Sequence, residues 1–293
     1  MSLIIGSHVG YNNKTQLLGS VNEAISYNAN TFMFYTGSTQ STLRSEINDE
    51  LTYEAYKLMI DNNINSNNVI VHAPYIINLA NREHEDKFMF YVDFFKEELN
   101  RVKKLGLNKI VLHPGSAVNC SREDGIKNII DGLNLVISKT SDTIILLETM
   151  AGKGNELGIN IDEINSIING IDDKSRIGVC LDTCHLNDSG IDIGEFDKYL
   201  DEFDKIIGID KIKCVHVNDS MNPIGSHKDR HQNIGYGTIG FDKLCNVIYN
   251  NRLEGIPFIL ETPWVNRNQP DEYPPYKMEI ENFRNKKFID FIQ

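Results

Sequence analysis

Histidine and carboxylate side chains stand at or near the ends of several short apolar segments of the chain. These residues are His8, His72, His113, Glu148, Asp182, His216 and Glu261. If the segment ends converge, uncompensated carboxylates and imidazoles crowded together would repel one another and carry a desolvation cost. A divalent metal removes both penalties, and mixed nitrogen and oxygen ligands suit Zn²⁺ best, with Mn²⁺ or Fe²⁺ as substitutes. The pattern therefore predicts a metal centre.

Two local motifs add further metal ligands. In LDTCHL, Asp182 and His185 stand three residues apart at an expected strand-to-helix turn, so both can face one site. In HKDRH, the spacing of two between Asp229 and His231 places both on one side of an extended loop. Nine ligands exceed what one or two ions need, so about three ions per chain are expected. The nine are His72, His113, Glu148, Asp182, His185, His216, Asp229, His231 and Glu261.

The remaining histidines and the cysteines have other interpretations. His84 and His227 are expected on the surface, and His8 is a group behind the ligands, a substrate contact or a structural residue. Cys180 and Cys184 lie near the expected ligands, but two buried thiols are the better interpretation. The five cysteines are an odd, scattered set, typical of reduced thiols in an intracellular protein rather than of a disulfide framework.

The elements that would position these residues repeat eight times, each as an apolar run, a polar loop and a longer amphipathic stretch. The expected strands cover 3–8, 31–36, 69–72, 109–113, 143–148, 176–182, 213–219 and 257–261. The expected helices cover 14–28, 52–62, 86–105, 122–138, 161–169, 195–207, 241–250 and 278–291. Eight such units predict a (β/α)8 TIM barrel in a single domain spanning 1–293, with a doubly wound open sheet as the alternative. In a TIM barrel the carboxyl ends of the strands meet at one mouth, which is where the ligands would converge.

Bulk composition limits the class of protein. A chain of 293 residues with 41% hydrophobic residues can bury a full core, and no apolar run approaches the ~20 residues needed to cross a bilayer. No signal peptide is evident, so an intracellular, cytoplasmic location is expected, and abundant Asn, Ile and Lys fit the AT-rich genome of a bacterium or a large DNA virus. The net charge of −12 argues against a simple basic nucleic-acid binder, although several divalent ions would offset it locally.

Longer motifs carry a resemblance to a known family. They are IGSHVG (5–10), VHAPYIINLA (71–80), VLHPGS (111–116), LLETMAGKGNELG (146–158), CLDTCHLNDSGID (180–192), HVNDSMNPIGSHKDRHQNIGYGTIG (216–240) and ILETP (259–263). In these motifs the chain resembles the endonuclease IV family of zinc-dependent abasic-site endonucleases over nearly its whole length. The resemblance implies an intracellular, monomeric TIM barrel that hydrolyses the phosphodiester 5′ to an abasic site in double-stranded DNA and trims blocked 3′ ends.

The resemblance also implies how three zinc ions share the ligands. His72 and His113 would hold one ion, with Glu148 bridging to a second. The second ion would be completed by Asp182, His216 and Glu261. The third ion would be held by His185, Asp229 and His231. Glu148 is then the candidate catalytic residue that orients or deprotonates the attacking water.

Contacts to DNA follow from the same resemblance. The family bends the duplex and flips the abasic nucleotide out, with side chains wedged into the gap. Tyr75 and Ile76 match the wedge positions, the alternative being a loop tyrosine that packs on its own barrel. His8, Gln40 and Arg230 are further expected DNA contacts.

One loop departs from the family pattern. After the second expected strand the family reads close to TKNxR, whereas this chain has TGSTQ at 36–40, with Gly37 and Gln40 at the basic positions. A positive contact to phosphate is therefore missing unless Arg44 or a residue elsewhere replaces it. The departure concerns affinity for DNA and selectivity for abasic sites, not the phosphodiester chemistry.

Two other functions fit parts of the pattern. A metal-dependent sugar isomerase or epimerase shares the barrel and a carboxylate–histidine site, but one or two ions suffice for its chemistry. A DNA-binding or metal-storage protein without catalysis would not need ligands drawn from separate strands.

Overall fold

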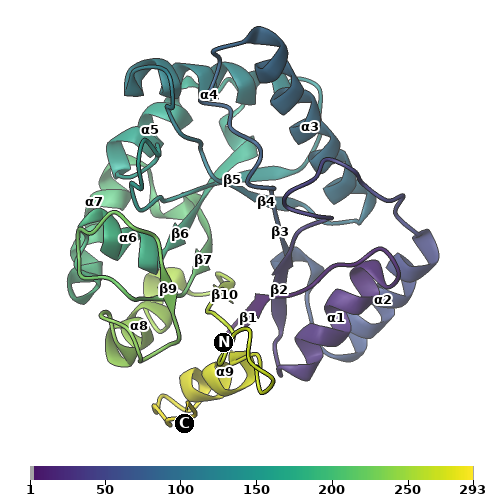
Figure 1. The fold of residues 1–293 in the computed structure, drawn as a ribbon, viewed down its shortest axis with the longest axis vertical. Helices are drawn as coiled ribbons and strands as arrows, with labels where there is room; N and C mark the ends of the chain where they lie inside the picture. Colours follow the sequence, from purple (N-terminus) through teal and green to yellow (C-terminus); the bar gives the residue numbers. More distant parts are fainter. Residues whose placement is uncertain (1–2, 293) are drawn as a thin grey trace.

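The strands of the computed structural model, which describes residues 3–292, close into a parallel barrel (Figure 1). Their order around the barrel is β1-β10-β7-β6-β5-β4-β3-β2. They are β1 (Ile5–His8), β2 (Thr31–Phe34), β3 (Ile70–His72), β4 (Lys109–Leu112), β5 (Ile144–Glu148), β6 (Ile177–Asp182), β7 (Ile212–His216) and β10 (Phe258–Leu260). The predicted TIM barrel is confirmed, and the open-sheet alternative is wrong because β1 pairs with both β2 and β10.

The α-helices surround the barrel (Figure 1). They are α1 (Gln16–Ser26), α2 (Asp49–Asp61), α3 (Glu85–Lys104), α4 (Arg122–Ile137), α5 (Ile161–Gly170), α6 (Thr183–Ser189), α7 (Phe196–Ile206), α8 (Phe241–Ile248) and α9 (Tyr276–Arg284). Several start at side-chain caps: Asn48, Ser121 and Asn160 each accept a hydrogen bond from a backbone N–H three residues on. Within residues 3–292, no helix is long and apolar enough to cross a membrane.

The core has two layers because successive side chains of a strand point to opposite faces. In β5, Ile145 and Leu147 pack outward beneath the helices, whereas Leu146 joins a smaller cluster inside the barrel. Burial on both faces explains why the strands read as near-continuous apolar runs in the sequence.

Three segments differ from the sequence prediction. After β6 the chain forms the short helix α6 before α7, where only the second helix was expected. The last helix ends at Arg284 instead of 291, because Lys286 takes a left-handed φ of 50° and the chain turns back. The chain after Lys286 then passes Tyr236, whose hydroxyl accepts a hydrogen bond from the Phe291 N–H. The expected loop after β7 contains an antiparallel pair, β8 (Asp219–Ser220) and β9 (His231–Gln232), which presents the HKDRH motif.

Candidate metal centre

Six of the predicted ligands occupy equivalent places along their strands. The barrel interior holds a cluster from seven strands, formed by Met33, Ile70, Val111, Leu146, Cys180, Cys214 and Ile259. Side chains two residues apart share a face of a strand, so the residue two positions after each of these also faces the barrel axis, one layer nearer the mouth. These residues are Tyr35, His72, His113, Glu148, Asp182, His216 and Glu261. The alternation of the strands therefore brings the ligands together.

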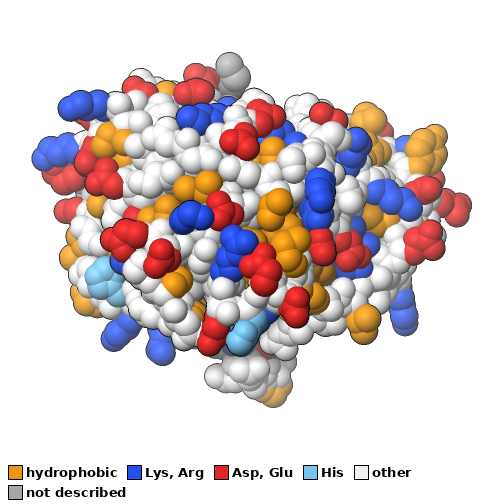
Figure 2. All heavy atoms as spheres, turned by 90° about the horizontal axis from the view of Figure 1, so that it is seen from above, with side chains coloured by type: hydrophobic (Ala, Val, Ile, Leu, Met, Phe, Trp, Pro, Cys, Tyr) orange, Lys and Arg blue, Asp and Glu red, His pale blue; other side chains and the backbone are white. Residues whose placement is uncertain are grey.

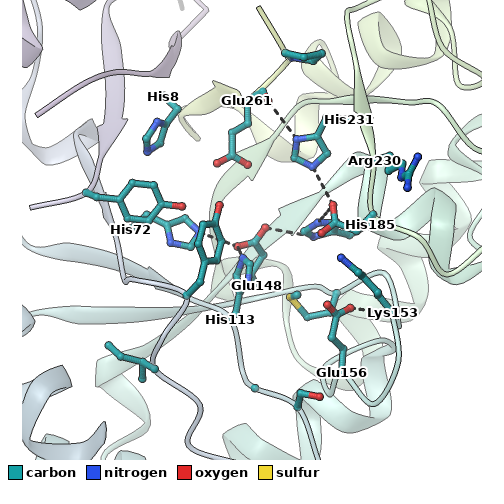
Figure 3. A pocket seen from close by; sticks show the side chains of 18 of the residues that line it. His8, His72, His113, Glu148, Lys153, Glu156, His185, Arg230, His231 and Glu261 are labelled. Atoms are coloured by element: carbon teal, nitrogen blue, oxygen red, sulfur yellow. Dashed lines mark hydrogen bonds and ion pairs between the residues drawn. The ribbon is translucent and has the colours of Figure 1, made fainter. Parts of the chain in front are cut away.

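Glu148 lies at the centre of the group (Figure 3). It is 1% exposed, and its two oxygens face different neighbours. Oε2 lies 3.2 Å from His72 Nε2 and 3.1 Å from His113 Nε2. Oε1 lies 3.1 Å from His216 Nδ1 and 3.3 Å from His185 Nδ1. One carboxylate thus connects two pairs of imidazoles.

The electrostatics of the site follow from this crowding. Burial alone would raise the pKa of Glu148, but attraction to His216 and His113 outweighs it and holds the pKa well below the usual range. Burial would likewise lower the pKa of His185, yet Asp182, Asp229 and Glu148 raise it well above its ordinary value. The protein alone therefore already favours carboxylates in their ionised, ligating form.

A second group of ligands surrounds His185. Its Nε2 lies 3.0 Å from Asp229 Oδ1, and its backbone N–H donates to Asp182 Oδ1 at 2.8 Å, which makes Asp182 the N-cap of α6. His231 Nε2 lies 3.5 Å from Asp229 Oδ1, so the HKDRH pair does share one side. The expected reason was wrong, however, because Asp229 takes a left-handed φ of 54° and the loop is not extended there.

Two polar residues that sequence reasoning missed hold these ligands in place. Asp188 accepts hydrogen bonds from the Asp229 N–H at 3.0 Å and from Ser220 Oγ at 2.7 Å, so it fixes the backbone of the segment that carries the HKDRH motif. Asn218 donates to Asp182 Oδ2 at 2.7 Å and accepts from the Glu261 N–H at 2.8 Å. Both are wholly buried. Ligands with such partners keep their orientation when metal arrives.

The residues present fit a multinuclear metal centre. Ligand atoms lie within 4.8 Å of one another in three overlapping groups, which are His72–His113–Glu148, Glu148–Asp182–His216–Glu261 and Asp182–His185–His231. Asp229 forms a fourth group with His231 and Cys184. His231 Nε2 is buried without a hydrogen-bond partner, whereas its Nδ1 lies 3.2 Å from the Glu261 carbonyl oxygen. That arrangement leaves Nε2 free to ligate.

The other histidines and cysteines stand mostly where the sequence predicted. His84 and His227 are exposed, and Cys180 and Cys184 are buried. His8 lines the cavity with its Nε2 unpaired, and burial lowers its pKa to about 4. A neutral imidazole at this place is suited to a substrate contact rather than to an ion pair.

A cavity of about 780 Å³ opens above the ligands. Tyr75, 60% exposed, lies at its mouth, while Ile76 is partly buried against the core and does not line the cavity. Tyr35 was missed: its ring lies 4.7 Å from that of His8 and 5.7 Å from that of Tyr75, measured between centroids. Its position two residues after Met33 was the signal that could have revealed it.

The loop after β2 turns its basic side chain inward. Arg44 is ion-paired with buried Glu98, at 2.5 Å between Nε and Oε1, and its side chain is 2% exposed. A Cβ at Gly37 would lie 3.0 Å from the Arg44 side chain, so a larger residue there would crowd it. Gln40 is exposed and lies outside the cavity lining. The charge of Arg44 is therefore turned into the protein, away from the cavity.

Comparisons with known proteins identify the family. Residues 21–285 match the family model described as xylose isomerase-like TIM barrel. The chain is 50% identical over 289 residues to a protein named probable endonuclease 4 from Acholeplasma laidlawii, covering 98% of this chain and 96% of that one. It also resembles the crystal structure of endonuclease IV from Thermus thermophilus, with a TM-score of 0.80, 28% identity and coverage of 96% and 97%. A D-tagatose 3-epimerase-like protein shares the fold alone, at 18% identity and a TM-score of 0.68 over 96% of both chains. The chain therefore belongs to the endonuclease IV family and is a nuclease of the hydrolase class.

Proposed function

We propose that this chain is a DNA repair endonuclease that hydrolyses the phosphodiester 5′ to an abasic site in duplex DNA and trims blocked 3′ ends. We further propose that it acts as a monomer with three Zn²⁺ ions. The observation that carries the proposal is the position of Glu148, whose two oxygens face two separate pairs of imidazoles. A bridging carboxylate of this kind is what two neighbouring cations require.

The ligand groups support one division of the nine residues. His72 and His113 would hold the first ion, and Glu148 would bridge it to the second. Asp182, His216 and Glu261 would complete the coordination of the second ion. His185, Asp229 and His231 would hold the third ion. Bound ions would supply Lewis acidity, which lowers the pKa of water to about 7 and offsets negative charge on the phosphate.

The chain's own residues would do the remaining work. Glu148 would orient the attacking water, because its ionised carboxylate lies at the centre of the ligand imidazoles. Tyr75 would occupy the space left by the extruded nucleotide, since an exposed aromatic ring at the cavity mouth can stack on an unpaired base step. His8 and Arg230, which line the same cavity, would contact the DNA backbone.

A sugar isomerase or epimerase is the alternative that the shared barrel suggests, but the membership of the endonuclease IV family argues against it. Its chemistry needs one or two ions, so the group formed by His185, Asp229 and His231 would have no role. Nothing else in the cavity favours a sugar over a phosphodiester.

One assay separates the candidates. Protein purified without chelator is incubated with a duplex that carries a single abasic site, with the same duplex lacking it, and with a ketose sugar. We expect a cut 5′ to the abasic site that leaves a 3′-hydroxyl, lost with chelator and restored by Zn²⁺. An uncut abasic duplex together with conversion of the sugar would favour the isomerase.

A further inference from the structure

The basic side chains that line the cavity come from loops on the arc of the barrel between β5 and β10. Among the described residues that line the cavity, the Lys and Arg side chains are Lys153, Arg230 and Arg267. Lys153 follows β5, Arg230 directly precedes β9, and Arg267 follows β10. In the barrel order, β5 lies three strands from β2 and β10 lies two, so none of these cations comes from the part of the rim that carries the loop 36–40.

The loop after β2 has basic residues nearby but directs them into the protein. Arg44 pairs with buried Glu98, as described above. Arg101 of α3 donates from Nη2 to the Thr36 carbonyl at 3.0 Å and from Nη1 to the Ser45 carbonyl at 2.8 Å. Both arginines therefore hold the loop in shape, and neither has a charge free for DNA.

The three cavity cations are exposed and have no carboxylate within ion-pair distance in the part of the chain from 3 to 292. Several other surface cations are paired with carboxylates. Figure 2 shows a face on which acidic and basic side chains are intermixed. On α3 and α4, for example, Lys96 contacts Asp93 and Lys127 contacts Asp131. Unpaired cations at a cavity keep their charge available for an anionic ligand.

Lys153 is aimed at the metal centre. Figure 3 shows its side chain extending from its loop toward His185. Its backbone N–H donates to Glu156 Oε2 at 2.8 Å, which fixes the turn. His227 holds the other end of this turn, because its Nδ1 lies 2.9 Å from the Ala151 carbonyl oxygen and its ring leaves no room for a Cβ at Gly152. The loop is therefore built to present the ammonium group at the ligands.

We propose that Lys153 and Arg267, together with Arg230, bind DNA phosphates from the β5–β10 side and supply the contact that Gly37 and Gln40 do not. Lys153 contacts the phosphate that is cut, where its charge offsets the negative charge that grows during hydrolysis. Arg267 contacts a neighbouring phosphate, since it lines the cavity from the loop after β10. The inference rests on the proposed function, because it requires DNA as the ligand.

The test measures binding over a salt series. Lys153→Ala and Arg267→Ala are each placed in a metal-loaded Glu148→Gln background and titrated with abasic duplex. Each lost phosphate contact should flatten the dependence of log affinity on log salt by roughly 0.9. Lys139→Ala is the matched control: Lys139 is exposed and unpaired, and it stands beyond the end of α4, at the opposite end of the barrel.

A second readout separates the two residues. In the otherwise unaltered enzyme, Lys153→Ala should lower kcat by roughly tenfold or more, with partial rescue in Lys153→Arg, whereas Arg267→Ala should raise KM and leave kcat nearly unchanged. Unchanged salt slopes in both variants, while the unaltered protein still cuts abasic duplex, would overturn this inference alone. If the unaltered protein neither bound nor cut the duplex, the proposed function would fail with it.

Discussion

Asp188 gives the sharpest test of how the protein holds the ligands proposed for the third ion, which are His185, Asp229 and His231. Its carboxylate is wholly buried and accepts four hydrogen bonds. Oδ2 accepts from the Asp229 N–H and from Asn222 Nδ2, both at 3.0 Å. Oδ1 accepts from Ser220 Oγ at 2.7 Å and from Asn187 Nδ2 at 3.0 Å. Every partner donates, so the site has no place for an amide NH2 group.

Asp188→Asn would turn an NH2 group toward two of these donors. Two bonds to a charged acceptor, each worth ~1.5–3 kcal/mol, would be lost, so we expect the free energy of unfolding to fall by about 3–6 kcal/mol. At 2–4 °C per kcal/mol, the Tm should fall by roughly 6 °C or more. The loop that carries Asp229 and His231 would lose an anchor, so the metal content should fall from about three ions to about two.

The assay combines thermal unfolding with elemental analysis on the same preparation. Asp173→Asn serves as the control, because Asp173 is exposed and caps a short turn by accepting from the Ser175 N–H at 3.1 Å, a role that Asn fills equally well. A variant Asp188→Asn with the Tm and metal content of the unaltered protein would refute the view that this carboxylate shapes the third group.

Three further predictions use other parts of the site and core. Glu148→Gln should keep the fold and most DNA binding but lose strand cleavage by several orders of magnitude, since an amide bridges two cations poorly and accepts no proton; near-normal turnover would show that the catalytic centre lies elsewhere. Gln40→Arg, in a cleavage-dead background, should tighten binding to abasic duplex and steepen the salt dependence by roughly 0.9, with an unchanged slope indicating that this loop does not reach DNA. Burial raises the pKa of Glu279 from 4.5 to about 7, so its stabilising contribution is full below pH 4.5 and is lost as pH rises through 7. Thermal unfolding between pH 5 and pH 8 should therefore show a smaller fall in Tm for Glu279→Gln than for the unaltered protein, and equal falls would count against this reasoning.

The sequence was sufficient for the barrel and for bringing the ligands together, because both follow from strand periodicity. His72, Glu148 and Asp182 end their strands, and parallel strands of a barrel end at one mouth. Alternate residues of a strand share a face, and Tyr35 stands two residues after Met33 of the inner cluster. The same rule therefore predicts Tyr35 at the mouth, although its strand carries no histidine or carboxylate there.

Other features depend on contacts between distant segments, which no local pattern reveals. The inward turn of Arg44 is set by Glu98, 54 residues later. The left-handed backbone of Asp229 is held by Asp188, 41 residues earlier. The spacing therefore predicted correctly that Asp229 and His231 lie together, but for the wrong reason, because the loop between them is not extended.

If nine side chains hold three ions at the mouth of the barrel, the metal content of the purified protein reveals them directly. Protein prepared without chelator is analysed for zinc, manganese and iron against an independent measurement of protein concentration. We expect about three ions per chain, mainly zinc, bound tightly enough to survive gel filtration. A reproducible value near one ion per chain would contradict the trinuclear centre.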